Sequence, residues 1–110
     1  MGTQVSYASP ELKNQCLDPV MAEQAYGRTH ADRLATMIAD AEAFENAREW
    51  HDFLGEDLVS AATKSFRVAF GTLYTASFEA IDNYQLVDGA GQVDWSTVQY
   101  IKLTEIAGQQ

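Results

Sequence analysis

Apolar residues recur every three or four positions in the first half of the chain. The strongest run lies on one helical face: Ala31, Leu34, Ala35, Ile38 and Ala41. Charged side chains such as Asp32 and Arg33 fall on or near the opposite face. This spacing predicts an amphipathic helix of about four turns that presses Leu34 and Ile38 against a core.

Two shorter helices are expected before this one, because a capping residue followed by proline occurs twice. Ser9-Pro10 and Asp18-Pro19 each place a side-chain acceptor ahead of a proline, which suits the first helical position. The first helix would carry Leu12 and Cys16 on the same side. Gly27 separates the second short helix from the long one.

The period of the apolar positions changes from about 3.6 to 2 at Ser65. Phe66, Val68 and Phe70 would point one way and Arg67 the other, and the alternation resumes in Tyr74, Ala76 and Phe78. With Gly71-Thr72 as a turn between the two runs, the pattern predicts a β-hairpin over residues 65–79.

Two further strands complete the predicted sheet. Residues Thr3–Tyr7 and Val98–Ile106 alternate polar and apolar positions, whereas 82–94, with Asp88-Gly89-Ala90-Gly91 at its centre, is expected to be a long loop. Helices come first and most strands later. This order favours an α+β fold, with the N-terminal helices packed on one face of a small antiparallel sheet.

Size and cysteine content limit the possibilities further. The 110 residues, 46% of them hydrophobic, fit a single domain over 1–110 with one core. Cys16 is the only cysteine, so neither an internal disulfide nor a two-cysteine metal site is expected, and no motif indicates a cofactor. No apolar stretch reaches the roughly 20 residues of a membrane helix, and no signal peptide is recognised, which predicts a cytoplasmic protein.

The chain is strongly acidic. Sixteen Asp and Glu residues outnumber seven Lys and Arg residues, which gives a formal net charge of −9. Nucleic-acid affinity depends on cationic side chains that displace condensed counterions, so weak or no binding to free nucleic acid is expected. A small local basic patch is still compatible with this charge, and a basic protein would be attracted.

His51 is the first candidate catalytic residue. It lies between the helical half and the hairpin, and a histidine can act as a general acid or base near neutral pH. Its neighbours Asp52, Glu56 and Asp57 would favour the charged imidazolium. The alternative is a structural histidine, which is also the interpretation of His30 at the start of the long helix.

Cationic and aromatic side chains on or beside the predicted strands are the second candidates: Lys64, Arg67, Tyr74 and Lys102. A sheet face with Arg, Lys, Tyr and His could hold a phosphodiester and stabilise its developing charge without a metal. The alternative is that these residues keep the sheet surface soluble.

The order of motifs resembles the HigB-type plasmid-maintenance killer proteins, a branch of the RelE/ParE toxin superfamily. The likeness starts with a strand followed by Leu12-Lys13 and Cys16, and continues with Tyr26-Gly27 ahead of Ala31-Asp32-Arg33-Leu34. It includes His51-Asp52-Phe53-Leu54-Gly55-Glu56, similar to the family's histidine-x-leucine-x-glycine-acid motif. It ends with the family's closing strands, matched by Phe78-Glu79, Asp94-Trp95, Val98 and Ile101 to Ile106.

The resemblance implies a compact sheet with helices on one face and a toxin that is neutralised by a helix-turn-helix antitoxin. Active members cleave mRNA in the ribosome by attack of the 2′-hydroxyl on the adjacent phosphate, without metal. By this resemblance, His51 would be the general acid or base, Lys64 and Arg67 would hold phosphate, and Tyr74 would orient the nucleophile.

Two departures from the family pattern leave the function open. The family's tyrosine-arginine-leucine-x-phenylalanine motif aligns its arginine with Thr75 if Phe78 is the phenylalanine, or with Arg67 if the motif is Phe66–Phe70. The chain also has Ala107-Gly108-Gln109-Gln110 where members commonly carry aspartate-tyrosine-histidine. The two hypotheses are therefore an active mRNA endoribonuclease and a catalytically inactive RelE-like module that binds an antitoxin or another basic protein.

Overall fold

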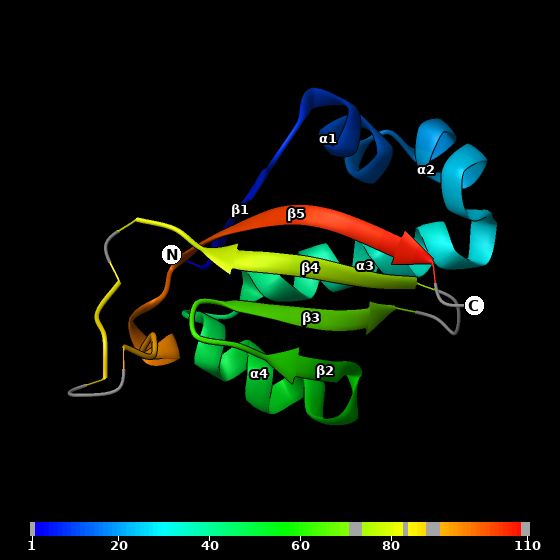
Figure 1. The fold of residues 1–110 in the computed structure, drawn as a ribbon. Helices are drawn as coiled ribbons and strands as arrows, with labels where there is room; N and C mark the ends of the chain where they lie inside the picture. Colours follow the sequence, from blue (N-terminus) through cyan, green and yellow to red (C-terminus); the bar gives the residue numbers. More distant parts are fainter. Residues whose placement is uncertain (1, 71–73, 83, 88–90, 109–110) are drawn as a thin grey trace.

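A five-stranded sheet forms the centre of the molecule (Figure 1). The computed structural model describes residues 2–70, 74–82, 84–87 and 91–108. The strands of the described chain are β1 (Gln4–Tyr7), β2 (Leu58–Ala61), β3 (Ser65–Phe70), β4 (Tyr74–Ala80) and β5 (Tyr100–Gly108). The helices are α1 (Pro10–Leu17), α2 (Pro19–Tyr26), α3 (Arg28–Ala43) and α4 (Ala47–Leu54), with 3₁₀ turns η1 (Gly55–Asp57) and η2 (Trp95–Thr97).

The sheet has the strand order β1-β5-β4-β3-β2. Neighbouring strands from β5 to β2 are antiparallel, and β3 and β4 form the hairpin predicted from the alternation. The α+β class is confirmed, with helices packed against the sheet. The sheet is mixed rather than wholly antiparallel, however, because β1 runs parallel to β5. Parallel pairing is possible here because most of the chain intervenes between the two strands.

The two predicted helix starts are confirmed by their hydrogen bonds. Ser9 Oγ accepts from the Leu12 amide at 3.1 Å, and Asp18 Oδ1 accepts from the Val20 amide at 2.9 Å. Gly27 ends α2 and begins α3 with a φ of +83°, a conformation that residues with a Cβ rarely adopt. The caps thus determine where the first three helices begin.

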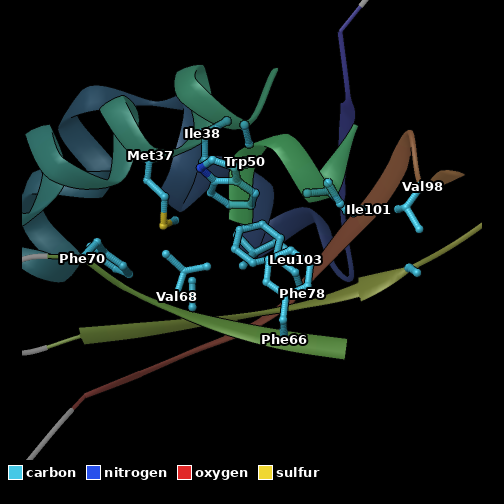
Figure 2. Packing of buried hydrophobic residues seen from close by; sticks show 14 of the residues in the cluster. Met37, Ile38, Trp50, Phe66, Val68, Phe70, Phe78, Val98, Ile101 and Leu103 are labelled. Atoms are coloured by element: carbon cyan, nitrogen blue, oxygen red, sulfur yellow. The ribbon is translucent and has the colours of Figure 1, made fainter. Parts of the chain in front are cut away.

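The core lies between the sheet and the pair α3 and α4. Figure 2 shows Met37 and Ile38 of α3 and Trp50 of α4 above the strands, facing Val68 and Phe78. Leu34 and Ile38 are buried as predicted. The prediction that Ala35 belongs to the buried face of α3 is wrong, because Ala35 is exposed. Met37, which was not assigned to that face, is buried in the core.

Helix α4 was not predicted, although its sequence has a clear amphipathic pattern. Ala47, Trp50 and His51 are buried and Leu54 is half-buried, which is the spacing of one helical face. Asn46 Oδ1 accepts from the Glu49 amide at 3.0 Å, and Glu49 Oε1 accepts from the Glu45 amide at 3.0 Å. The first bond satisfies a free amide in the first turn of the helix, and the second joins the residue before the cap to that turn, an arrangement similar to a capping box.

The connection after β4 agrees with the predicted loop where the structure describes it. It contains one isolated bridge, between Leu86 and Val93, and Gly91 has a φ of +66°. The predicted turn at Gly71-Thr72 and residues 88–90 of the loop lie outside the described residues. The last strand starts at Tyr100 rather than Val98, because the preceding residues form η2, capped by Asp94.

Candidate functional site

The four predicted catalytic residues lie on two sides of the sheet. His51 belongs to α4, which covers one face, and Tyr74 alternates with Thr75 so that its ring lies on this same face. Arg67 belongs to the opposite, open face, and Lys64 reaches Glu79 there. The structure therefore does not bring the four side chains together in one cleft.

His51 is packed in the core. It is 8% exposed, and its ring centroid lies 4.3 Å from that of Phe66 and 5.0 Å from that of Trp95. Its Nε2 has no hydrogen-bond partner among the described residues. Burial lowers the pKa of His51 to about 4, and this outweighs the nearby Asp52 carboxylate, which raises it. The expectation that acidic neighbours favour the imidazolium is wrong, because desolvation dominates.

Tyr74 belongs to a separate aromatic group at the other end of the hairpin. Its ring centroid lies 5.1 Å from Tyr26, 5.1 Å from His30 and 5.7 Å from Phe70. His51 contacts Phe66, four residues earlier on β3 than Phe70, which is about 13 Å along a strand. Tyr74 and His51 are therefore on the same face but do not share a site.

The open face carries the cationic candidates. Arg67 Nε donates to Ser60 Oγ at 3.3 Å, and Lys64 Nζ lies 3.6 Å from Glu79 Oε1. A shallow cavity of about 420 Å³ follows these strands. Its polar lining residues are Ser60, Ser65, Arg67, Ser77, Glu79 and Thr104. Hydroxyl groups beside a guanidinium can bind an anion, although Glu79 opposes it.

Thr75 and Arg67, the two positions at which the resemblance would place an arginine, both belong to this open face. Thr75 is paired with Ala69, and Arg67 lies two residues earlier on β3, opposite Ser77. Side chains two residues apart on a strand share a face, so Arg67 lies diagonally beside the Thr75 position. A guanidinium is therefore present near the position where one register lacks an arginine.

A second cavity, not anticipated from the sequence, lies on the helix side between α3, α4 and β3. We call it the α3–α4 groove; it has a volume of about 360 Å³. It is lined by Arg33, Thr36, Met37, Asp40, Trp50, Phe53, Leu54, Asp57, Val68, Ala69 and Phe70. Phe53 beside it is 61% exposed. The spacing of Ala47, Trp50, His51 and Leu54, together with Asn46 as a cap, was the sequence signal that could have indicated α4 and hence this groove.

Charge is distributed unevenly along the chain. Residues 28–57, which form α3, α4 and η1, contain eight acidic and three basic residues and carry −5 of the net −9. Residues 58–110, which supply β2 to β5, contain five acidic and three basic residues and carry −2. The acidity is therefore concentrated in the helices that flank the groove.

Comparisons with known proteins give no match for this chain, whether with family models, curated proteins or solved structures. Within the described ranges, no three His, Cys, Asp or Glu residues are grouped so as to hold a metal ion. No helix in the described part of the chain has both the length and the apolar character needed to cross a membrane.

Proposed function

We propose that this chain is a protein-binding module with a RelE-like arrangement that recognises a basic partner through its helix-covered side. The concentration of −5 in residues 28–57 is the observation that carries the proposal. Clustered carboxylates accelerate encounter with a cationic surface and disfavour anionic competitors. The partner class expected from the resemblance is an antitoxin, and any basic cytoplasmic protein meets the same requirement.

The placement of the predicted catalytic residues supports binding over catalysis. A general base must reach the proton that it removes, directly or through one water. His51 is buried on the helix side, whereas Arg67 is exposed on the other face of the sheet. No single substrate position on either face is within reach of both side chains.

A paired titration tests the proposal. The purified chain is titrated with a helical peptide of alanine and lysine and, separately, with a single-stranded RNA oligonucleotide of equal and opposite charge. We expect saturable binding of the peptide that weakens as salt is raised, since the Debye length falls from about 10 Å at 0.1 M to about 3 Å at 1 M. We expect weak or no binding of the RNA. Tighter binding of the RNA than of the peptide contradicts the proposal.

Metal-free RNA cleavage by a toxin of a toxin–antitoxin pair is the second candidate, favoured by the cavity that contains Arg67 and the hydroxyl groups around it. In this case Arg67 stabilises the charge on the phosphate, and Lys64, which pairs with Glu79, adds positive charge on the same face. Loss of such a charge-stabilising group typically reduces the rate 10²–10³-fold.

Induction of the chain in bacteria tests this candidate, alongside Arg67→Ala and His51→Ala variants, with growth and transcript cleavage followed. Cleavage that depends on Arg67 but not on His51 supports an active site on the open face. Absence of cleavage by the native chain rejects the candidate.

A further inference from the structure

We propose that the α3–α4 groove is the docking site for a helix of a basic partner, and that it receives one large apolar side chain flanked by lysine or arginine. This inference rests on the proposed function, because it names the place and the kind of segment that the binding module recognises. It follows from the lining of the groove, its charge and the pairing of the strand beneath it.

The floor of the groove is apolar. Met37, Trp50, Val68 and Phe70 lie beneath it, and all four are buried. Figure 2 shows these side chains arranged around the space between α3 and β3. Apart from the Trp50 Nε1–H group, these four side chains offer no hydrogen-bond partner, so a polar group that entered here would lose its hydration at a cost in free energy. An aromatic or long aliphatic side chain instead removes apolar surface from water.

The rim of the groove selects the residues on either side of that apolar side chain. Asp40, from α3, and Asp57, from η1, contribute carboxylates on its two sides. These carboxylates favour lysine or arginine residues on the partner helix, about one helical turn from the inserted apolar side chain. Arg33 is also on the rim and repels a cation beside it. Because the rim is negative at Asp40 and Asp57 but positive at Arg33, the groove favours one of the two directions in which a partner helix could lie.

The occupant is a helix rather than an added strand. Strand β3 lies beneath the groove and is hydrogen-bonded to β2 on one side and to β4 on the other. The pairing with β2 covers Phe66 to Val68, so only Ala69 and Phe70 are left without a partner on that side. An edge of two residues is too short to add an extended peptide as a further strand. A cavity bordered by two helices instead suits an amphipathic helix that lays its apolar face into it.

The fluorescence of Trp50 can report on whether the groove is occupied. Trp50 is 1% exposed, it lines the groove, and its Nε1 has no hydrogen-bond partner among the described residues. In a Trp95→Phe background Trp50 is the only tryptophan, so its emission reports on this site. The probe is a helical peptide without tryptophan, in which one phenylalanine is flanked by lysines. The comparison peptide replaces that phenylalanine with alanine.

Two pairs of variants test the groove. Thr36→Trp fills it from an exposed position on α3, and Ala39→Trp adds the same side chain at an exposed position that does not line it. Because each of these variants adds a second tryptophan to the Trp95→Phe background, their binding is measured from the anisotropy of a dye-labelled peptide and not from Trp50 emission. Asp40→Asn with Asp57→Asn removes the rim charges, and Glu42→Gln with Glu56→Gln makes the same change in net charge away from the rim. Far-ultraviolet circular dichroism establishes that each variant is folded.

We expect the phenylalanine peptide to bind more tightly than the alanine peptide and to change Trp50 emission. Thr36→Trp should weaken binding by about tenfold or more and Ala39→Trp by less than about twofold, a difference of more than 1 kcal/mol. The rim double variant should weaken binding about fivefold at low salt, and its control by less than about twofold.

The possible failures separate this inference from the proposed function. If both peptides bind equally and Thr36→Trp has no effect, the groove is not the site, while the binding function stands. If neither peptide binds at low salt, the binding function itself fails and the groove proposal fails with it. A Trp50 signal that changes on dilution of the Trp95→Phe chain alone would mean that a second copy occupies the groove, which also overturns the proposal.

Discussion

The two faces of the sheet differ in what covers them and in what they can do. On one face, α3 and α4 bury Leu34, Ile38 and Trp50 and leave an apolar groove between them. On the other, Arg67, Ser77 and Thr104 line a polar cavity that no described helix covers. The first face combines a core with an acidic surface, whereas the second has hydroxyl groups and a guanidinium.

This difference shows why a net charge is a weak guide to a binding site. A charge of −9 predicts repulsion of nucleic acid at long range, but −5 of it belongs to the α3–η1 segment. Arg67 and Lys102 lie on strands and Lys64 directly before β3, in the segment 58–110, which carries only −2. Each face therefore suits a different class of partner, and the acidic face is the one with an apolar groove.

The largest expected difference between the faces is in stability. Trp50→Ala should lower the free energy of unfolding by roughly 3–5 kcal/mol, because it removes a buried ring that packs on Phe66 and Phe78. Arg67→Ala on the open face should change it by about 0.5 kcal/mol or less. Urea denaturation measures both. Similar losses for the two variants would mean that the open face is as tightly packed as the covered one.

The buried His51 makes the covered face sensitive to acid. Its pKa is about 4 in the folded chain and 6.5 in an unfolded one, so the unfolded state binds more protons between these values. The contribution is fully present above pH 6.5 and is lost as the pH falls towards 4, by up to roughly 3 kcal/mol. Denaturation at several pH values, with His51→Leu as the reference, measures it. A pH dependence unchanged in His51→Leu would contradict this origin.

The cap of α4 should have a smaller effect. Asn46→Ala removes the acceptor for the Glu49 amide and should cost about 1 kcal/mol. Asn46→Asp keeps an acceptor at the same place and should cost only a few tenths. Thermal denaturation measures the loss of stability in each variant. Equal losses for Asn46→Ala and Asn46→Asp would show that the Asn46 cap does not stabilise α4.

The smallest expected effect is on the open face. Lys64 Nζ lies 3.6 Å from Glu79 Oε1, and the two side chains are 57% and 40% exposed to solvent. Exposed ion pairs contribute little, so Lys64→Met should change the free energy of unfolding by about 0.5 kcal/mol or less. Chemical denaturation at low and high salt checks this. A loss above about 2 kcal/mol would show that this pair organises the sheet surface.

Much of the fold could be predicted because its signals are local. Proline after Ser9 and Asp18 indicated two helix starts, and the alternation from Phe66 to Phe78 indicated the hairpin. The parallel pairing of β1 with β5 could not be predicted, since it joins segments about 95 residues apart and no local pattern encodes it. Helix α4 has helical spacing at Ala47, Trp50 and Leu54, but it is only eight residues long, and about two turns are too short for the apolar period alone to predict a helix.

The candidate site was less predictable for a different reason. Residue types indicated possible chemistry at His51, Arg67 and Tyr74, but the face that each side chain occupies depends on strand register and helix packing. A shift of one residue moves a side chain to the other side of a sheet. The pKa of His51 shows the same limit. Burial, which only the fold reveals, lowers this pKa by more than the adjacent Asp52 carboxylate raises it.

A residue-resolved titration tests most directly whether the acidic covered face is the binding surface. Backbone amide chemical shifts of the ¹⁵N-labelled chain are followed while the lysine-flanked phenylalanine peptide is added. The account predicts saturable shifts at Thr36, Asp40 and Asp57, and none of comparable size at Arg67, Ser77 and Thr104. Shifts confined to Arg67, Ser77 and Thr104 would contradict it.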